Sequence, residues 1–311
     1  MAAMLRLRSR LLAARPGLSL TRAPGPRGPA QAQAQSRSHS SSEAPPQGPG
    51  LTVRSQDQGI RKITLNNSKN RNALSLAMLQ SLRADLLHQI DSSDLQVIII
   101  AAEGPVFSSG HDLKELTSAK GQSFHSEIFK TCSEVMSLIQ DIPVPVIAKV
   151  DGLATAAGCQ LVASCDIAVA SERSKFATPG VNVGLFCSTP AVAVGRSLPR
   201  KVALEMLFTG ESISAHEALL HGLVSRVVPR EQVEAETLRI AHRICGTSRS
   251  VMALGKATFY RQMCLSRDEA YRVTALAMVE NLGLEDGQEG IRSFLQKRKP
   301  LWTHSLRKAR E

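Results

Sequence analysis

Two runs of small residues have the composition expected where backbone N–H groups bind a ligand. The first, Ser-Ser-Gly-His, occupies residues 108–111, and the second occupies residues 152–158 and contains Ala156, Ala157 and Gly158. Each run follows an apolar stretch and precedes a predicted helix, whose first turn has unpaired N–H groups and partial positive charge. The two turns are therefore candidates for binding an oxyanion, although a tight packing turn without a ligand explains the same pattern.

The cysteines do not have the spacing of a metal site. None forms a Cys-x-x-Cys pair and none has a histidine at ligand spacing, so we expect free thiols and no metal ion. The six are Cys132, Cys159, Cys165, Cys187, Cys245 and Cys264. Neither Cys187 nor the adjacent Ser188 has an evident base partner in the sequence, which argues against a nucleophile in that loop.

Alternating strands and helices must position the two turns. Buried strands are predicted at residues 95–102, 145–151 and 167–170, and further strands at 60–65 and 224–228. Helices are predicted from Ser75 to about Ile90, at 121–140, from Cys159 to Ser164, in pieces over 191–222, and at 230–245, 249–264, 266–281 and 286–296. This alternation predicts an α/β fold built from repeated strand–strand–helix units and followed by a helical C-terminal third.

The net charge of +11 is concentrated at the amino end. Residues 1–42 contain seven arginines and no acidic residue, so the rest of the chain carries only +4. That charge, with an aromatic content of 4%, argues against nucleic-acid binding. A basic, acid-free leader is typical of a mitochondrial transit peptide, with a disordered basic tail as the alternative. We expect a mitochondrial matrix protein, and no apolar run is long enough to predict a membrane helix.

The two small-residue segments belong to longer motifs. The motifs are Phe107-Ser-Ser-Gly-His-Asp-Leu-Lys-Glu115 and Pro145-Val-Ile-Ala-Lys-Val-Asp-Gly…Ala-Gly-Cys-Gln-Leu…Cys-Asp166. They resemble the two signature segments of the enoyl-CoA hydratase/isomerase (crotonase) superfamily, and Arg71-Asn-Ala-Leu74 and the Glu289-Gly…Phe-Leu-Gln-Lys-Arg-Lys-Pro300 stretch extend the resemblance over about residues 52–302.

The composition of the amino end and the family resemblance together imply a domain organisation. Residues 1–50 would be the transit peptide and disordered linker, followed by a crotonase-like ββα superhelix core at 51–228. A helical oligomerisation region would occupy 229–302, and a basic tail 303–311. The family commonly forms homotrimers or homohexamers, which is the assembly we expect, and membrane association is not expected.

The resemblance also implies a site for acyl-CoA, with no other cofactor. The thioester carbonyl would accept hydrogen bonds from the backbone N–H groups of His111 and Ala157. The CoA moiety would contact Lys69, Arg71 and Ala73, together with Phe294 and Lys297 near the C-terminus. Most family members have Gly at position 157, but Ala can serve if its φ is negative, because only the N–H is used.

The chain departs from the family at both hydratase glutamates. Gln160 occupies the position of the first, and Gly180 occupies that of the second. Neither residue can gain and lose a proton near neutral pH, as general acid–base catalysis requires. His111 is titratable and lies at the first turn, so its side chain is a candidate replacement.

Three functions remain open from the sequence. The first is an acyl-CoA enzyme of altered chemistry in lipid or fatty acid metabolism, for which ordinary hydratase activity is not expected. The second is a catalytically inactive acyl-CoA-binding or regulatory homologue. The third is an RNA-binding relative, which the low charge of the body argues against.

Overall fold

The computed structural model describes residues 50–309 of the 311-residue chain. The predicted leader and linker, residues 1–50, therefore lie outside the described residues except for Gly50. Within the described part, no helix is both long and apolar enough to cross a membrane.

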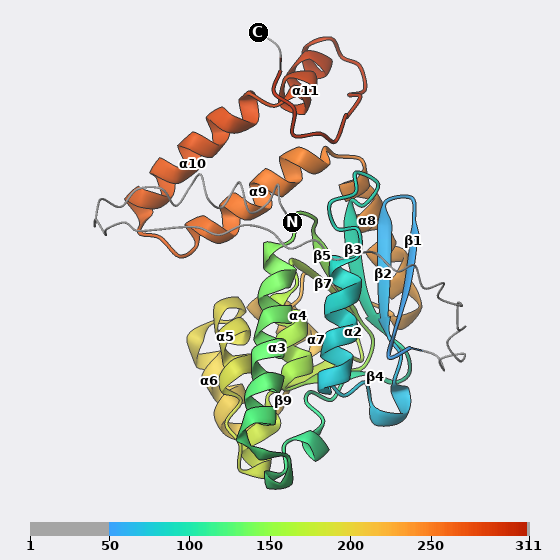
Figure 1. Cartoon of the computed structure of the whole chain (residues 1–311), viewed down its shortest axis with the longest axis vertical. Coiled ribbons are helices and arrows are strands. Elements are labelled where there is room, and N and C mark those ends of the chain that lie inside the picture. Colours follow the sequence, from blue (N-terminus) through green and yellow to red (C-terminus); the bar gives the residue numbers. More distant parts are fainter. Residues whose placement is uncertain (1–49, 310–311) are drawn as a thin grey trace, which may run out of the picture. The chain divides into compact units, whose positions relative to one another are not determined.

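Within residues 50–309, ten strands form two sheets, which Figure 1 shows with the helices around them. The six-stranded sheet contains, in spatial order, β1 (Thr52–Asp57), β2 (Ile60–Leu65), β3 (Val97–Ala102), β5 (Val146–Val150), β7 (Ile167–Ser171) and β10 (Arg226–Val228). The four-stranded sheet contains β4 (Val106–Ser108), β6 (Leu153–Thr155), β8 (Lys175–Ala177) and β9 (Ser212–Ser214). From β2 to β10 the larger sheet is parallel, whereas β1 pairs with β2 in an antiparallel arrangement.

The helices follow the strands in the predicted order. They are α2 (Leu76–Leu87), α3 (Gly121–Asp141), α4 (Ala157–Ser164), α5 (Ser188–Ser197), α6 (Arg200–Thr209), α7 (Ala215–His221), α8 (Val233–Cys245), α9 (Arg249–Gln262), α10 (Arg267–Leu282) and α11 (Glu285–Leu295). Three strand pairs, β3–β4, β5–β6 and β7–β8, each send one strand to each sheet, and a helix comes after each pair. This pattern confirms the predicted α/β class with strand–strand–helix units and a helical C-terminal region.

The parallel sheet is buried on both faces, as its continuous apolar strands predict. In β3, Ile98 and Ile100 belong to the large core that contains the buried face of α2 and α3. Val97 and Ile99 point to the other face and pack in a second core with Val233 and Ala241 of α8. Because successive side chains of a strand alternate between faces, one apolar run serves both cores.

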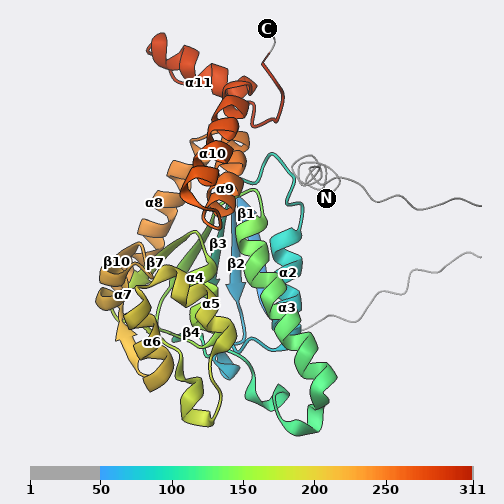
Figure 2. The same cartoon turned by 90° about the vertical axis from the view of Figure 1, so that its left-hand side faces the viewer.

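Helix α9 is joined to the amino end of the sheet by buried polar contacts. The Lys256 ammonium lies 2.7 Å from Asp166 and also donates to the carbonyls of Ile139 and Val144. The Tyr260 hydroxyl donates to the other oxygen of Asp166 at 2.7 Å. Figure 2 shows α9 and α10 stacked beyond this end of the strands.

The residues predicted as a basic tail, 303–311, are described as far as Ala309. They are hydrogen-bonded to the segment that joins α10 and α11: the Glu285 N–H donates to the carbonyl of Arg307 at 2.9 Å, and the Ala309 N–H donates to that of Gly283 at 2.9 Å. This part of the C-terminus is therefore packed along helices of the same chain.

Candidate functional site

The two small-residue turns lie against each other at the carboxyl ends of the strands. A Cβ atom placed on Gly110 would lie 2.8 Å from the Cβ of Ala156 and 3.2 Å from the backbone nitrogen of Ala157. A Cβ on Gly158 would lie 2.6 Å from the carbonyl oxygen of Ser108. The two turns approach so closely that neither position has room for a side chain, so both require glycine.

Two neighbouring backbone N–H groups are left without an acceptor at this contact. The Gly110 N–H donates to the Ser108 hydroxyl at 3.2 Å, and the Ala156 N–H donates to the carbonyl of Ala177 at 2.9 Å. Within residues 50–309, the N–H groups of His111 and Ala157 have no such partner. Ala157 is the first residue of α4, so the helix dipole adds positive character there. The arrangement can bind an oxygen that carries negative charge.

Ala156 has a strained backbone at the start of α4. Its φ is 49° and its ψ is −119°, a conformation that glycine adopts easily and alanine does not. Ala157, which follows it, is not among the residues with positive φ. The condition for Ala157 to present its N–H is thus met, and the strain falls on the preceding residue.

The first turn is fastened to the loop before α2 by Asn72, a residue whose role the sequence did not reveal. Asn72 is fully buried, and its side-chain amide donates to the carbonyls of Glu103 at 2.9 Å and Val106 at 2.8 Å. Its own carbonyl accepts from the Ser108 hydroxyl at 2.8 Å. The motif Arg71-Asn-Ala-Leu was the available signal, because a buried amide in a loop holds backbone groups together.

The predicted CoA-contacting residues of this loop differ in exposure. Lys69 and Arg71 are exposed, and Ala73 is buried. Lys69 belongs to a short 3-10 helix, and Arg71 follows it with a left-handed φ of 53°. The Ser109 N–H donates to the Arg71 carbonyl at 3.0 Å, so the backbone of Arg71 lies directly beside the first turn.

Gln160 is placed by α4 inside the protein. It is only 4% exposed, and its amide oxygen lies 4.0 Å from the Sγ of Cys132 on α3. Burial raises the pKa of the Cys132 thiol to about 12, and that of Cys159 also to about 12. Both thiols are therefore protonated at neutral pH and supply no base beside Gln160.

Gly180 is covered by the residues that follow it in the same loop. A Cβ atom at this position would be 2.5 Å from the carbonyl oxygen of Leu185 and 2.8 Å from the Sγ of Cys187. The loop thus closes over the place where family hydratases carry a second glutamate. Cys187 is 8% exposed, and burial raises the pKa of its thiol.

The His111 imidazole has one ring nitrogen paired and one free. Its Nδ1 lies 3.2 Å from the carbonyl of Leu74, and its ring packs edge-on against Phe129 with centroids 5.2 Å apart. Nε2 is buried and has no hydrogen-bond partner within residues 50–309. Burial lowers the pKa of His111, an effect that the Leu74 carbonyl opposes. A neutral ring that donates from Nδ1 leaves a lone pair on Nε2.

Helix α11, which carries Phe294, is tied to the amino end of β3. The Ser248 hydroxyl, just before α9, donates to Asp286 of α11 at 2.5 Å. The next residue, Arg249, donates from its guanidinium to the carbonyl of Leu95 at 2.9 Å. Leu95 lies two residues before the first residue of β3, so α11 lies at the end of the sheet where the parallel strands begin.

The loop of Lys69 and Arg71 lies where those strands end. β3 spans six residues, which corresponds to about 20 Å at the usual rise per residue. Figures 1 and 2 likewise show β4 and α11 far apart within the described part of the chain. One copy of the chain therefore does not bring Phe294 and Lys297 together with Lys69 and Arg71.

Within residues 50–309, no group of three or more His, Cys, Asp or Glu side chains is arranged as metal ligands. The site contains a pair of backbone donors, the imidazole of His111 and two basic side chains.

Known proteins share this arrangement of sheets and turns. The chain matches the family described as enoyl-CoA hydratase/isomerase over residues 55–305. It is 66% identical over 282 residues to enoyl-CoA hydratase domain-containing protein 3, mitochondrial, of Mus musculus, which covers 91% of this chain and 90% of the mouse protein.

Solved structures agree with the sequence relatives. The crystal structure of human enoyl-CoA hydratase domain-containing protein 3 is 67% identical, has a TM-score of 0.80, and covers 81% of this chain and 99% of that one. An enoyl-CoA hydratase of Mycobacterium smegmatis is 42% identical with a TM-score of 0.80, and covers 82% and 99%. The predicted crotonase-like fold is thereby confirmed, and the chain belongs to the enoyl-CoA hydratase/isomerase (crotonase) family.

Proposed function

We propose that this protein binds acyl-CoA in the mitochondrial matrix and places the thioester carbonyl between the backbone N–H groups of His111 and Ala157. The observation that carries the proposal is that these two amides, one on each turn, lack acceptors while their neighbours Gly110 and Ala156 are paired. A thioester oxygen gains negative charge when an enolate or tetrahedral species forms, and two preorganised donors stabilise that charge.

The reaction differs from ordinary hydration. Gln160 cannot exchange a proton, and Gly180 has no side chain and no room for one. The hydratase route, in which two carboxylates handle the water and the α-proton, is therefore closed to this chain. We assign it a role in lipid metabolism with altered acyl-CoA chemistry.

His111 is the group that favours catalysis over simple binding. Its buried Nε2 has no hydrogen-bond partner within residues 50–309, and burial lowers the pKa of the ring, which favours its neutral form. A proton acceptor of this kind can remove a proton from a carbon next to a thioester whose oxygen is held by amide donors. If the His111 ring only packs against its neighbours and accepts no proton, the protein is an inactive acyl-CoA-binding or regulatory homologue.

The CoA moiety requires a second copy of the chain. Lys69 and Arg71 lie at one end of the sheet, and Phe294 and Lys297 lie at the other, so a partner must supply the second pair. Helix α10 exposes apolar side chains that suit such an assembly: Leu276, Met278, Val279 and Leu282. We propose a homotrimer or a homohexamer.

The proposed location depends on the leader and on the relatives. The mouse relative is named mitochondrial, and residues 1–42 here are rich in arginine and free of acidic residues. A transit peptide has this composition. Residues 1–50 would accordingly be targeting sequence and linker.

Calorimetry tests the binding proposal. Crotonyl-CoA should bind more tightly than free crotonate, because both the thioester oxygen and the nucleotide contribute. Gly110→Ala should weaken crotonyl-CoA binding, since the added methyl would lie 3.2 Å from the donor nitrogen of Ala157. The matched control is Gly121→Ala, whose φ of 80° is similar to that of Gly110 (85°) but which has open space around it. Equal binding of thioester and acid would refute the proposal, and a turnover screen over acyl-CoAs then separates enzyme from binder.

A further inference from the structure

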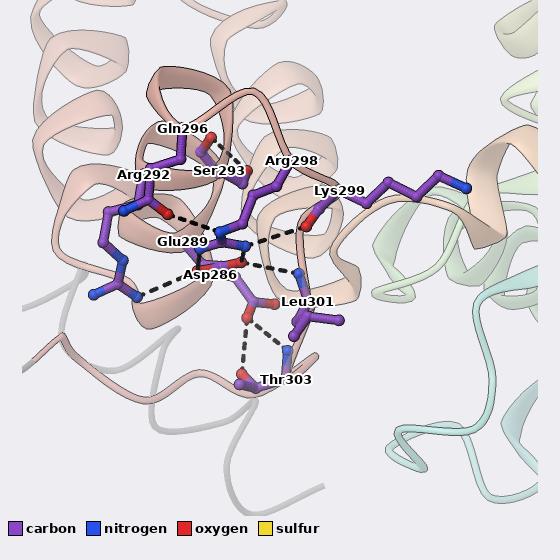
Figure 3. Close-up of polar contacts among 10 residues, drawn as sticks. Asp286, Glu289, Arg292, Ser293, Gln296, Arg298, Lys299, Leu301 and Thr303 are labelled. Carbon is purple, nitrogen blue, oxygen red and sulfur yellow. Dashed lines mark hydrogen bonds and ion pairs between the residues drawn. The ribbon is translucent and has the colours of Figure 1, made fainter.

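The chain after α11 is fastened back onto that helix by two buried carboxylates (Figure 3). We call residues 298–309 the C-terminal strap. Asp286, 1% exposed, accepts from the backbone N–H and hydroxyl of Thr303, both at 2.8 Å, and from the backbone N–H of His304 at 3.0 Å. Each of these donors belongs to the strap, so Asp286 holds its middle.

The second carboxylate holds the beginning of the strap. Glu289, 7% exposed, accepts both guanidinium NH groups of Arg298 at 2.6 and 2.9 Å and the Leu301 N–H at 3.0 Å. These contacts keep the pKa of Glu289 at about 2, so the carboxylate is charged at neutral pH. Such paired, charge-assisted contacts are short and directional, and they fix geometry as well as adding stability.

The strap is also tied to helices before α11. The Trp302 indole donates to the carbonyl of Gly246 at 2.9 Å, and the His304 Nδ1 accepts from the Arg249 N–H at 3.2 Å. Ser248 donates to Asp286 from the side of α9. One carboxylate of α11 thus connects α9 with the strap, and the end of α11 is held from both sides.

Between the two anchors and the strap lie the last turn of α11, which carries Phe294, and the short turn after it, which carries Lys297. The Arg298 N–H donates to the carbonyl of Ser293 at 3.0 Å, and the Lys297 N–H donates to that of Phe294 at 3.1 Å. Lys297 has a left-handed φ of 52°, and Phe294 is 82% exposed. Of residues 293–298 only Ser293 is buried, so packing does not fix this segment, and the contacts of Asp286 and Glu289 with the strap hold the backbone that follows Phe294 and Lys297.

We propose that Asp286 and Glu289 are positioning residues which, through the C-terminal strap, hold Phe294 and Lys297 in place for the nucleotide of CoA in a partner's site. The inference rests on the proposed function. An exposed ring and an ammonium suit an adenine face and a phosphate. Holding them before binding lowers the ordering cost of capture, which selects CoA thioesters over thioesters that lack the nucleotide.

The test compares crotonyl-CoA with crotonyl-pantetheine, which has the same acyl group and no nucleotide. Dissociation constants are measured by calorimetry for the wild-type chain and for a chain that ends at Lys297, which keeps Phe294 and Lys297 but lacks the strap. Strap removal should weaken crotonyl-CoA binding by about tenfold, the loss expected for one charge-assisted contact, and leave crotonyl-pantetheine unchanged. The full-length double variant Asp286→Asn/Arg298→Gln should behave likewise if the shortened chain does not fold.

Two further variants separate positioning from a general loss of stability. Arg292→Gln removes a different and more exposed partner of Glu289, 3.4 Å away and outside the strap, so it should leave the preference for crotonyl-CoA intact. Lys297→Met should weaken crotonyl-CoA binding, and adding it to the shortened chain should weaken binding no further, because both changes remove the same contact.

The outcomes distinguish the two proposals. If the wild type prefers crotonyl-CoA and every strap variant retains that preference, the strap inference is wrong and the proposed function stands. A lower melting temperature with an unchanged ratio of the two dissociation constants would show a purely structural strap and would also overturn the inference. Wild-type protein that binds neither compound would refute the proposed function and the inference with it.

Discussion

At the carboxyl ends of the parallel strands the chain presents backbone groups and small side chains, whereas at their amino ends it presents buried charges. The first region depends on Gly110, Ala156 and Gly158, where two turns approach within contact distance. The second depends on Asp166 with Lys256, whose side chain is only 7% exposed, and on the carboxylates of Asp286 and Glu289.

The difference determines how each region responds to change. A backbone N–H group cannot be removed by a side-chain mutation. The first region is therefore perturbed by substitutions that add a side chain at a glycine. A charge-assisted contact is lost when one partner is neutralised, so the second region is disturbed by mutation of a side chain or by acid.

The largest effect concerns hydration. The wild-type chain should hydrate crotonyl-CoA more slowly than a two-glutamate hydratase by at least about 10²–10⁴-fold, because a positioned acid or base contributes that much. Gln160→Glu alone should recover little, since groups that act as a unit are not additive. Loss of the enoyl absorbance measures the rate.

Gly180→Glu provides the companion experiment. Its Cβ would lie 2.5 Å from the carbonyl oxygen of Leu185, so the loop must move and the variant should lose stability without gaining activity. Wild-type turnover at rates typical of hydratases would contradict the prediction, and would show that His111 or another group supplies the proton chemistry.

A methyl group at Gly158 should separate the two turns. Gly158→Ala places a Cβ 2.6 Å from the Ser108 carbonyl oxygen, and crowding of this kind costs about 1–3 kcal/mol of the free energy of unfolding. Gly195→Ala is the matched control, because Gly195 is also helical but has no neighbour within 4 Å. It should instead stabilise by about 0.5–1 kcal/mol. Denaturant unfolding measures both, and equal effects would contradict the predicted contact.

The two regions also differ in how far the sequence predicted them. The apolar run at Val97–Ile100 predicted a strand buried on both faces, because burial follows from local pattern. The small residues of the two turns predicted an oxyanion site or a tight packing turn, but they did not predict that the two turns contact each other. The closure of the loop over Gly180 was not predicted either, since it depends on where Leu185 and Cys187 return in space.

Other features of the site depend on contacts between distant segments. The buried amide of Asn72 bonds to groups more than thirty residues away in the chain, and no local pattern shows such partners. The roles of Phe294 and Lys297 came from resemblance alone, which names residues but does not place them. Their separation from Lys69 and Arg71 required the topology of the sheet.

Acid should weaken the charged region selectively. The pKa of Glu289 is lowered from its ordinary 4.5 to about 2 by Arg298 and by the Leu301 N–H. Its contribution to stability is therefore fully present above pH 4.5 and lost as the pH falls toward 2. The melting temperature of the wild type should fall more steeply across this range than that of Glu289→Gln. If the melting temperatures of the wild type and of Glu289→Gln fall in parallel with pH, the ion pair between Glu289 and Arg298 adds no stability.

The smallest predicted effect concerns the strained residue of the backbone region. Ala156→Gly removes a methyl group from a residue with φ of 49° and ψ of −119°, where strain costs about 1–3 kcal/mol. Glycine loses more conformational entropy on folding, about 0.5–1 kcal/mol, so the net stabilisation should be roughly 1 kcal/mol, or about 2–4 °C in Tm. Ala157→Gly, whose φ is not positive, has no strain to relieve and should not stabilise. Both variants keep a backbone N–H group at position 157, so each should still bind crotonyl-CoA. If Ala156→Gly destabilises the protein, the packing of the Ala156 methyl group against Gly110 contributes more free energy than the backbone strain costs. The contact with Gly110 would then be what stabilises the turn.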